Sequence, residues 1–341
     1  MSLWFRNLTV MFVVAAVSLA ATPAFPSEDD LAEVRDLFDQ QHYLEARRAL
    51  EDLSGEIAEA GEALYYGGRL DLIDGDYDRA VKSLEHAVKA EPNRSDYHYW
   101  LGVAMMRKMP YRSSLGRMMS GMKMVKELRK AVELDPGNLM ARMTLFQILA
   151  RSYDMGGSQK QDLIEQVKAI AEIDSVMGHV ARGTFYQLVE RDLGSAGAEF
   201  ETGFGLGPRN RAAVVSYADY LWASDRRDEA IAILTSFIEE VPEDKPARFN
   251  LGVKTVLLGR DYAAAERIFE DCLSLKSDTG MPSEPMVRWC LGLACHLRGK
   301  YDRAEEEWSA VYRIDKDFDD ILKKTPDLAE LDAILKTDST D

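Results

Sequence analysis

One pattern of residues recurs along most of the chain, with a period of about 34 residues. Its copies begin near Gly61, Arg211, Lys245 and Pro285. The last copy is the most complete and contains Leu291-Gly292, Gly299-Lys300-Tyr301, Ala304 and Trp308. A unit this short buries its apolar face only by stacking against neighbours like itself. The recurrence therefore predicts a repeat array rather than a single globular core.

Each position of the pattern has a physical task in a pair of helices. Small residues such as Gly252 and Gly292 let two helices approach closely. Gly75, Gly259 and Gly299 are expected to end the first helix of a pair in a left-handed conformation. Prolines then end the second helices, at Pro92, Pro136, Pro208 and Pro242. No alternating apolar stretch lies between the turns, so we expect no strands.

These residues resemble the tetratricopeptide repeat over almost all of the chain after residue 24. The resemblance implies an all-α, right-handed α-solenoid of about eight helix pairs. A helix near Asp327 to Lys336 is expected to cap the array. A looser similarity, to a group of exported bacterial repeat proteins, rests on Leu134-Asp135-Pro136 and Gly156-Gly157-Ser158. We therefore expect one domain over residues 25–341, with a short acidic tail at about 337–341.

The first 24 residues have the pattern of a cleavable signal peptide. Arg6 is their only charged residue, the apolar run extends from Leu8 to Ala21, and Thr22-Pro23-Ala24 follows. A membrane-spanning helix needs about 20 apolar residues, and Pro23 ends this run short of that length. The segment therefore predicts export, with cleavage after Ala24 and a periplasmic or secreted protein.

Charge and cysteine content narrow the remaining classes. The formal net charge is −16, which argues against nucleic acid as a partner because phosphate binding needs a basic surface. Of the three cysteines, Cys290 and Cys295 are spaced so that they point different ways along one helix. Pairing of Cys272 with either one stays open, although buried thiols are the favoured interpretation.

The third unit contains about ten residues more than the period allows. This insert, at about residues 105–124, holds seven of the 15 methionines, and no acid occurs from Tyr97 to Lys126. The candidate site residues in it are Met105, Met106, Met109, Arg112, Arg117, Met118, Met119 and Met122. The methionines either fill an irregular core or form an adaptable, basic binding surface. Peripheral contact with an anionic membrane is a further alternative, and copper(I) capture is the least favoured.

No motif for catalysis, metal or cofactor binding is present in the sequence. It lacks a nucleophile elbow, a zinc-protease helix, a phosphate loop and a dinucleotide fingerprint. The five histidines are scattered over different units without a metal-binding partner at helical spacing. We therefore predict no enzyme activity, no cofactor and no metal.

The resemblance also implies where a partner binds, because the first helix of each pair lines the concave face in the repeat family. Its inward positions correspond to Tyr65, Arg69, Tyr99, Val103, Phe249, Val253, Trp289, Leu293 and His296. This apolar and aromatic set suits a peptide or an amphipathic helix. The predicted function is a non-catalytic scaffold for a protein partner in an exported assembly. The alternatives are a small-ligand-binding accessory protein of a solute uptake system and membrane-surface association through the insert.

Overall fold

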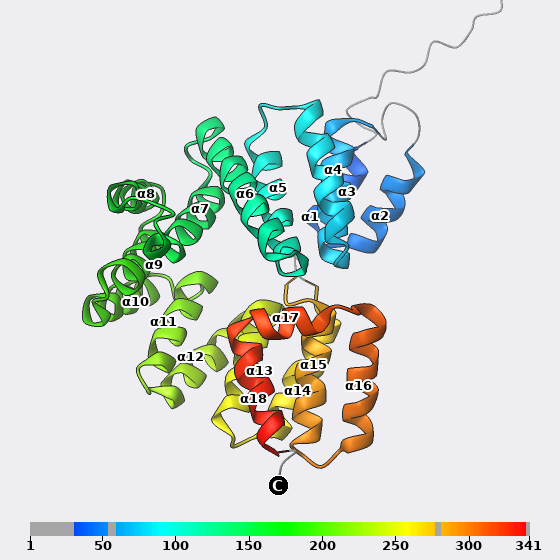
Figure 1. The fold of residues 1–341 in the computed structure, drawn as a ribbon, viewed down its shortest axis with the longest axis vertical. Coiled ribbons are helices and arrows are strands. Elements are labelled where there is room, and N and C mark those ends of the chain that lie inside the picture. The colour runs from blue at the N-terminus through cyan, green and yellow to red at the C-terminus, as the bar shows by residue number, and fades with distance from the viewer. Residues whose placement is uncertain (1–30, 54–58, 277–280, 339–341) are drawn as a thin grey trace, which may run out of the picture.

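The computed structural model describes residues 31–53, 59–276 and 281–338 (Figure 1). All regular structure in these ranges is helical. Eight helix-turn-helix pairs follow one another: α1 (Ala32–Asp39) with α2 (Tyr43–Asp52), α3 (Gly61–Asp74) with α4 (Tyr77–Ala90), α5 (Ser95–Lys108) with α6 (Ser114–Leu134), α7 (Leu139–Arg151) with α8 (Lys160–Ile173), α9 (Ser175–Phe185) with α10 (Leu193–Leu206), α11 (Arg211–Ala223) with α12 (Arg227–Glu240), α13 (Lys245–Leu258) with α14 (Tyr262–Ser274), and α15 (Glu284–His296) with α16 (Tyr301–Ile314). The predicted all-α solenoid of about eight pairs is confirmed.

Two further helices, α17 (Phe318–Lys324) and α18 (Pro326–Asp338), complete the chain. The last of them packs against α13 and α15, the first helices of the last two pairs, and the predicted capping of the array stays a prediction. The predicted signal peptide at 1–24 lies outside the described residues. Of the predicted tail at about 337–341, residues 337 and 338 belong to α18, and 339–341 lie outside the described residues. No helix in the described ranges combines the length and apolar character needed to cross a bilayer.

Close contacts within the pairs depend on the predicted glycines. A Cβ atom added at Gly252 would lie 2.6 Å from Cε1 of Phe269, and one at Gly292 would lie 2.5 Å from Nε1 of Trp308. Both distances are well below van der Waals contact, so only glycine permits this approach. The indole of Trp308 also donates a hydrogen bond to the Trp289 carbonyl, at 3.2 Å, which fixes its position.

The turns follow the predicted chemistry as well. Gly75, Gly259 and Gly299 have φ angles of 81°, 72° and 75°, the left-handed region that glycine adopts without strain. The three cysteines are buried, and none forms a disulfide in the part of the chain that the structure describes. Their apolar surroundings in α14 and α15 match the interpretation as buried thiols.

The array bends back on itself, so that pairs distant in sequence come together (Figure 1). The start of α6 lies beside α17, and a short 3-10 turn, η1 (Met109–Tyr111), contacts α17 directly. The extra residues of the third unit are η1 and the first turns of α6, which at 21 residues is the longest helix in the described ranges. The insert therefore lies where the first three pairs, α1 to α6, meet the C-terminal segment from α13 to α18. We call these two segments the two parts of the array.

We expect Gly292→Ala to lower the free energy of unfolding by about 1–3 kcal/mol, because the new methyl group displaces Trp308 from a packed position. The matched control is Gly205→Ala in α10, where a Cβ atom meets nothing within 4 Å. That change should raise stability slightly through helix propensity. Urea denaturation of both variants measures the difference, and equal effects would contradict the packing role of Gly292.

Candidate functional site

Four apolar side chains on the first turns of α6 face solvent. We call Leu115, Met118, Met119 and Met122 the Met stripe. Their exposed fractions are 64%, 59%, 61% and 64%. The spacing i, i+3, i+4, i+7 places all four on one face of the helix. A contiguous exposed stripe of this kind is typical of an interaction surface rather than of scattered surface residues.

The opposite face of α6 anchors the helix in the core. Ser120, Met124 and Leu128 are buried there, and Leu128 packs against Gly102 of α5. The helix begins at Ser114 because the Ser113 side chain accepts a hydrogen bond from the Gly116 N–H, at 3.2 Å. The Met stripe is therefore held outward by a helix with a fixed start and a buried back.

The exposed face of α6 becomes basic after the stripe. Lys126 and Arg129 continue it one and two turns further and are exposed, and Lys123 forms an ion pair with Glu85 of α4 at 2.6 Å. The first acid of the helix is Glu127, which is half-buried. The accessible surface is thus apolar at one end and cationic at the other.

His98 of α5 joins α6 to the rest of the pair. Its Nδ1 lies 2.7 Å from a carboxylate oxygen of Glu127, and its Nε2 lies 3.0 Å from the Pro92 carbonyl. Burial lowers the pKa of His98, but these two acceptors outweigh burial and raise it above 6.5. The hydrogen bond from His98 in turn lowers the pKa of Glu127 below 4.5. The pair is an ionic hydrogen bond that holds α6 against α5.

The candidate residues of the insert divide between core and surface. Met105 is buried, whereas Met106 and Met109 are half-buried against the core. Arg112 and Arg117 are also half-buried, and Arg117 donates a hydrogen bond to the Arg112 carbonyl. Met118, Met119 and Met122 are exposed, so the core interpretation does not hold for these three, and their role as a binding surface stays a prediction.

Most residues of the predicted concave set are covered by neighbouring helices. The buried members are Tyr65, Tyr99, Val103, Val253, Trp289 and Leu293. Arg69, Phe249 and His296 are half-buried. The Arg69 guanidinium lies 4.0 Å from the ring centroid of Trp100 and 4.2 Å from that of Phe38. These contacts bind helices to one another, and the role of the set in partner binding stays a prediction.

The contact between the two parts of the array was not predicted. Tyr111 of η1 donates a hydrogen bond to Asp315 at 2.8 Å, and Lys324 of α17 donates one to the Pro110 carbonyl. The ring of Tyr111 also lies 5.8 Å from that of Tyr77, measured between centroids. No local signal in the sequence indicates this junction, because Tyr111 and Asp315 are 204 positions apart.

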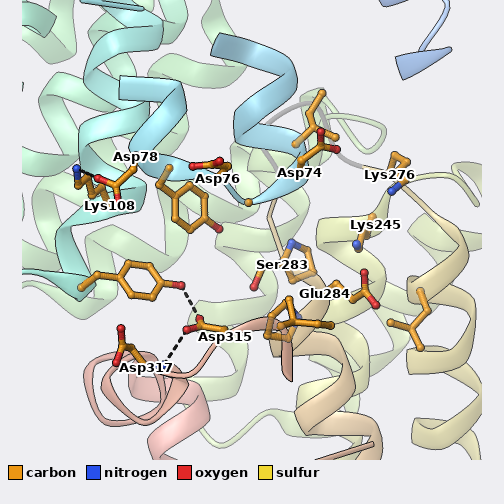
Figure 2. Close-up of a pocket in the computed structure, with 18 of the residues that line it drawn as sticks. Asp74, Asp76, Asp78, Lys108, Lys245, Lys276, Ser283, Glu284, Asp315 and Asp317 are labelled. Atoms are coloured by element: carbon orange, nitrogen blue, oxygen red, sulfur yellow. Dashed lines mark hydrogen bonds and ion pairs between the residues drawn. The ribbon is translucent and has the colours of Figure 1, made fainter. Parts of the chain in front are cut away.

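An open pocket of about 690 Å³ lies at the junction (Figure 2). Its wall combines the α3–α4 turn, the starts of α13 and α15, the end of α14 and the residues after α16. Its charged lining residues are Asp74, Asp76, Asp78, Lys108, Lys245, Lys276, Glu284, Asp315 and Asp317. Among the described residues, no group of three or more His, Cys, Asp or Glu side chains is arranged to hold a metal ion.

We expect the link between His98 and Glu127 to make stability depend on pH. Because the pKa of His98 is raised in the folded state, its contribution is complete below pH 6.5 and is lost as pH rises through the folded-state pKa. His98→Gln should therefore lower the free energy of unfolding by about 1.5–3 kcal/mol at acidic pH and by less at alkaline pH. Denaturation at both pH values measures this, with exposed His86→Gln as the control. A difference independent of pH would contradict the ionic link.

Comparison with known proteins supports the repeat interpretation. A family model described as the tetratricopeptide repeat matches residues 67–108, which extend from α3 to the end of α5. A search of curated protein sequences found no significant match.

Several solved structures are similar to this chain to different degrees. An IFIT1 monomeric mutant with Gppp-AAAA has a TM-score of 0.50 at 16% identity, covering 83% of this chain and 67% of its own. A tetratricopeptide protein of Thermus thermophilus has a TM-score of 0.40 at 17% identity, covering 67% and 98%. One from Parabacteroides merdae has 0.41 at 14% identity, covering 80% and 96%. The likeness concerns the fold: this chain is an α-solenoid of helix-turn-helix repeats, with a tetratricopeptide match at residues 67–108.

Proposed function

We propose that this protein is a non-catalytic scaffold that binds a protein partner through the Met stripe, acting outside the cytoplasm after removal of residues 1–24. The exposed stripe on α6 is the observation that carries the proposal. Methionine side chains are flexible and polarizable, so they adapt to varied apolar surfaces. The repeat fold is itself typical of scaffolds that mediate protein–protein interaction, which also supports a binding role rather than catalysis.

The chemistry of α6 specifies the kind of partner. An amphipathic helix places apolar residues against the Met stripe and acidic residues against Lys126 and Arg129. Neither of these two cations has an ion-pair partner among the residues that the structure describes. Complementary charge of this kind fixes the direction in which a helix docks and raises its association rate. The proposed occupant is therefore an acidic amphipathic helix of another protein.

A membrane surface is the competing occupant of the same face. Basic helices with an apolar face bind anionic lipid, usually through aromatic and leucine side chains. The Met stripe offers three methionines and one leucine, and no aromatic residue belongs to it. This composition favours a protein groove or helix, where adaptable packing matters more than insertion into acyl chains.

We expect Met118→Ser combined with Met122→Ser to weaken binding of a synthetic amphipathic peptide with a leucine face and a glutamate face. Loss of the two apolar contacts that Met118 and Met122 would make with the bound peptide should reduce affinity by at least about tenfold, equivalent to about 1.4 kcal/mol. Fluorescence anisotropy of the labelled peptide measures the affinity. Leu206→Ser, which removes an equally exposed apolar side chain from α10, is the matched control and should leave affinity unchanged.

Charge reversal tests the direction of docking. Lys126→Glu with Arg129→Glu should weaken the same peptide most at low salt, because the attraction is screened as ionic strength rises. Anionic phosphatidylglycerol vesicles provide the second arm. If the peptide does not bind but the vesicles do, and the Met118 and Met122 changes release them, the scaffold proposal is wrong and the membrane is the occupant.

A further inference from the structure

Lys245 occupies an unfavourable place in the junction pocket. It lies in the first turn of α13, where Asp244 caps the helix by accepting a hydrogen bond from the Ala247 N–H. The positive end of the helix dipole disfavours a cation at this position. Only 7% of Lys245 is exposed, and it has no hydrogen-bond or ion-pair partner in the described ranges. A lysine side chain so largely buried, with no ion pair among the described residues, lowers the stability of the unoccupied pocket.

A second lysine increases the positive charge on the same wall. Lys276, two residues after the end of α14, lies on the same side of the pocket as Lys245 (Figure 2). It likewise has no ion-pair partner among the residues described. Burial lowers the pKa of Lys245 and the charge of Lys276 lowers it further, whereas Cys272 and Glu284 act in the opposite direction. Glu284, the acid that acts on Lys245, is itself paired with Arg288 at 2.7 Å, so neither lysine has an ion pair of its own.

Most acids of the pocket form ion pairs with bases. Asp74 pairs with Arg47 at 2.8 Å, Asp76 with Arg79 at 3.8 Å, Asp78 with Lys108, and Glu284 with Arg288 at 2.7 Å. Asp315 and Asp317 are different. Asp315 accepts hydrogen bonds from the Tyr111 hydroxyl and from the Asp317 N–H, but neither carboxylate forms an ion pair with a described residue. The wall formed by these two residues lacks a cation.

We propose that the junction pocket binds a small zwitterion, with its carboxylate at Lys245 and Lys276 and its cationic group at Asp315 and Asp317. In Figure 2 the two lysines and the two aspartates lie on different sides of the pocket, and no ion pair joins them. A ligand with separated charges compensates both walls at once. The volume of about 690 Å³ suits a small molecule such as an amino acid or a short peptide.

Binding at this position connects the two parts of the array. Lys245 belongs to α13 and Lys276 follows α14, whereas Asp315 accepts the hydrogen bond of Tyr111 from the third unit. The α3–α4 turn supplies another wall. A ligand that also contacts the α3–α4 turn or Tyr111 stabilises the junction, because only the closed arrangement places these residues beside the four charged groups.

The probes are ω-amino acids of increasing length, from glycine through 4-aminobutyrate to 6-aminohexanoate, together with alanine dipeptides. Fatty acids and alkylamines of matched length are the controls that carry one charge each. We expect at least one zwitterion to bind in isothermal titration calorimetry and to raise the melting temperature more than either matched control. A series in which no zwitterion binds, or in which the acid alone binds equally well, would overturn the proposal.

Two variants assign the binding to the pocket. Lys245→Met should weaken the best zwitterion by at least about tenfold, while the melting temperature of the unliganded protein stays equal or rises because a buried charge is gone. Exposed Lys168→Met on α8 is the matched control and should leave binding unchanged. Asp315→Asn with Asp317→Asn should weaken the zwitterion and leave the weaker binding of the acid unaffected. If Lys245→Met retains full affinity, the assignment is wrong.

Discussion

The contact of η1 with α17 and the residues after α16 decides the form of this molecule. A solenoid built from nearest-neighbour contacts has free ends, and nothing in the repeat itself joins them. Here the hydrogen bonds from Tyr111 to Asp315 and from Lys324 to Pro110 connect the third pair with the end of the array. The extra residues of the third unit supply this contact, so a local departure from the repeat has a global consequence. The junction pocket exists because of it.

The insert has two tasks in addition to the core packing of a regular helix pair: it exposes the Met stripe, and it forms the junction. One face of α6 continues the core through Met124 and Leu128, as any second helix of a pair does. Its added turns carry the Met stripe into solvent, and η1 before them forms the junction. None of the stripe residues lines the junction pocket, whereas Tyr111 of η1 does.

Local sequence chemistry predicted the helix pairs well, because each boundary depends on nearby residues. Gly75, Gly259 and Gly299 end helices through a backbone conformation that needs no tertiary context. The concave set was harder to predict, since the alignment identifies a helix face but not what covers it. Tyr65, for example, stacks on Tyr97 of the next unit with ring centroids 4.8 Å apart. The junction and the isolation of Lys245 arise from segments far apart in the chain, so no pattern in the sequence indicates them.

The central claim is that the insert joins the two parts of the array in solution. Spin labels at exposed Lys82→Cys on α4 and Lys323→Cys on α17 report this directly through their distance distribution in pulsed electron spin resonance. The structure predicts one narrow distribution, which broadens and shifts to longer distance when Tyr111→Ala and Lys324→Ala remove the two hydrogen bonds. A broad distribution in the protein without those two changes would contradict the account.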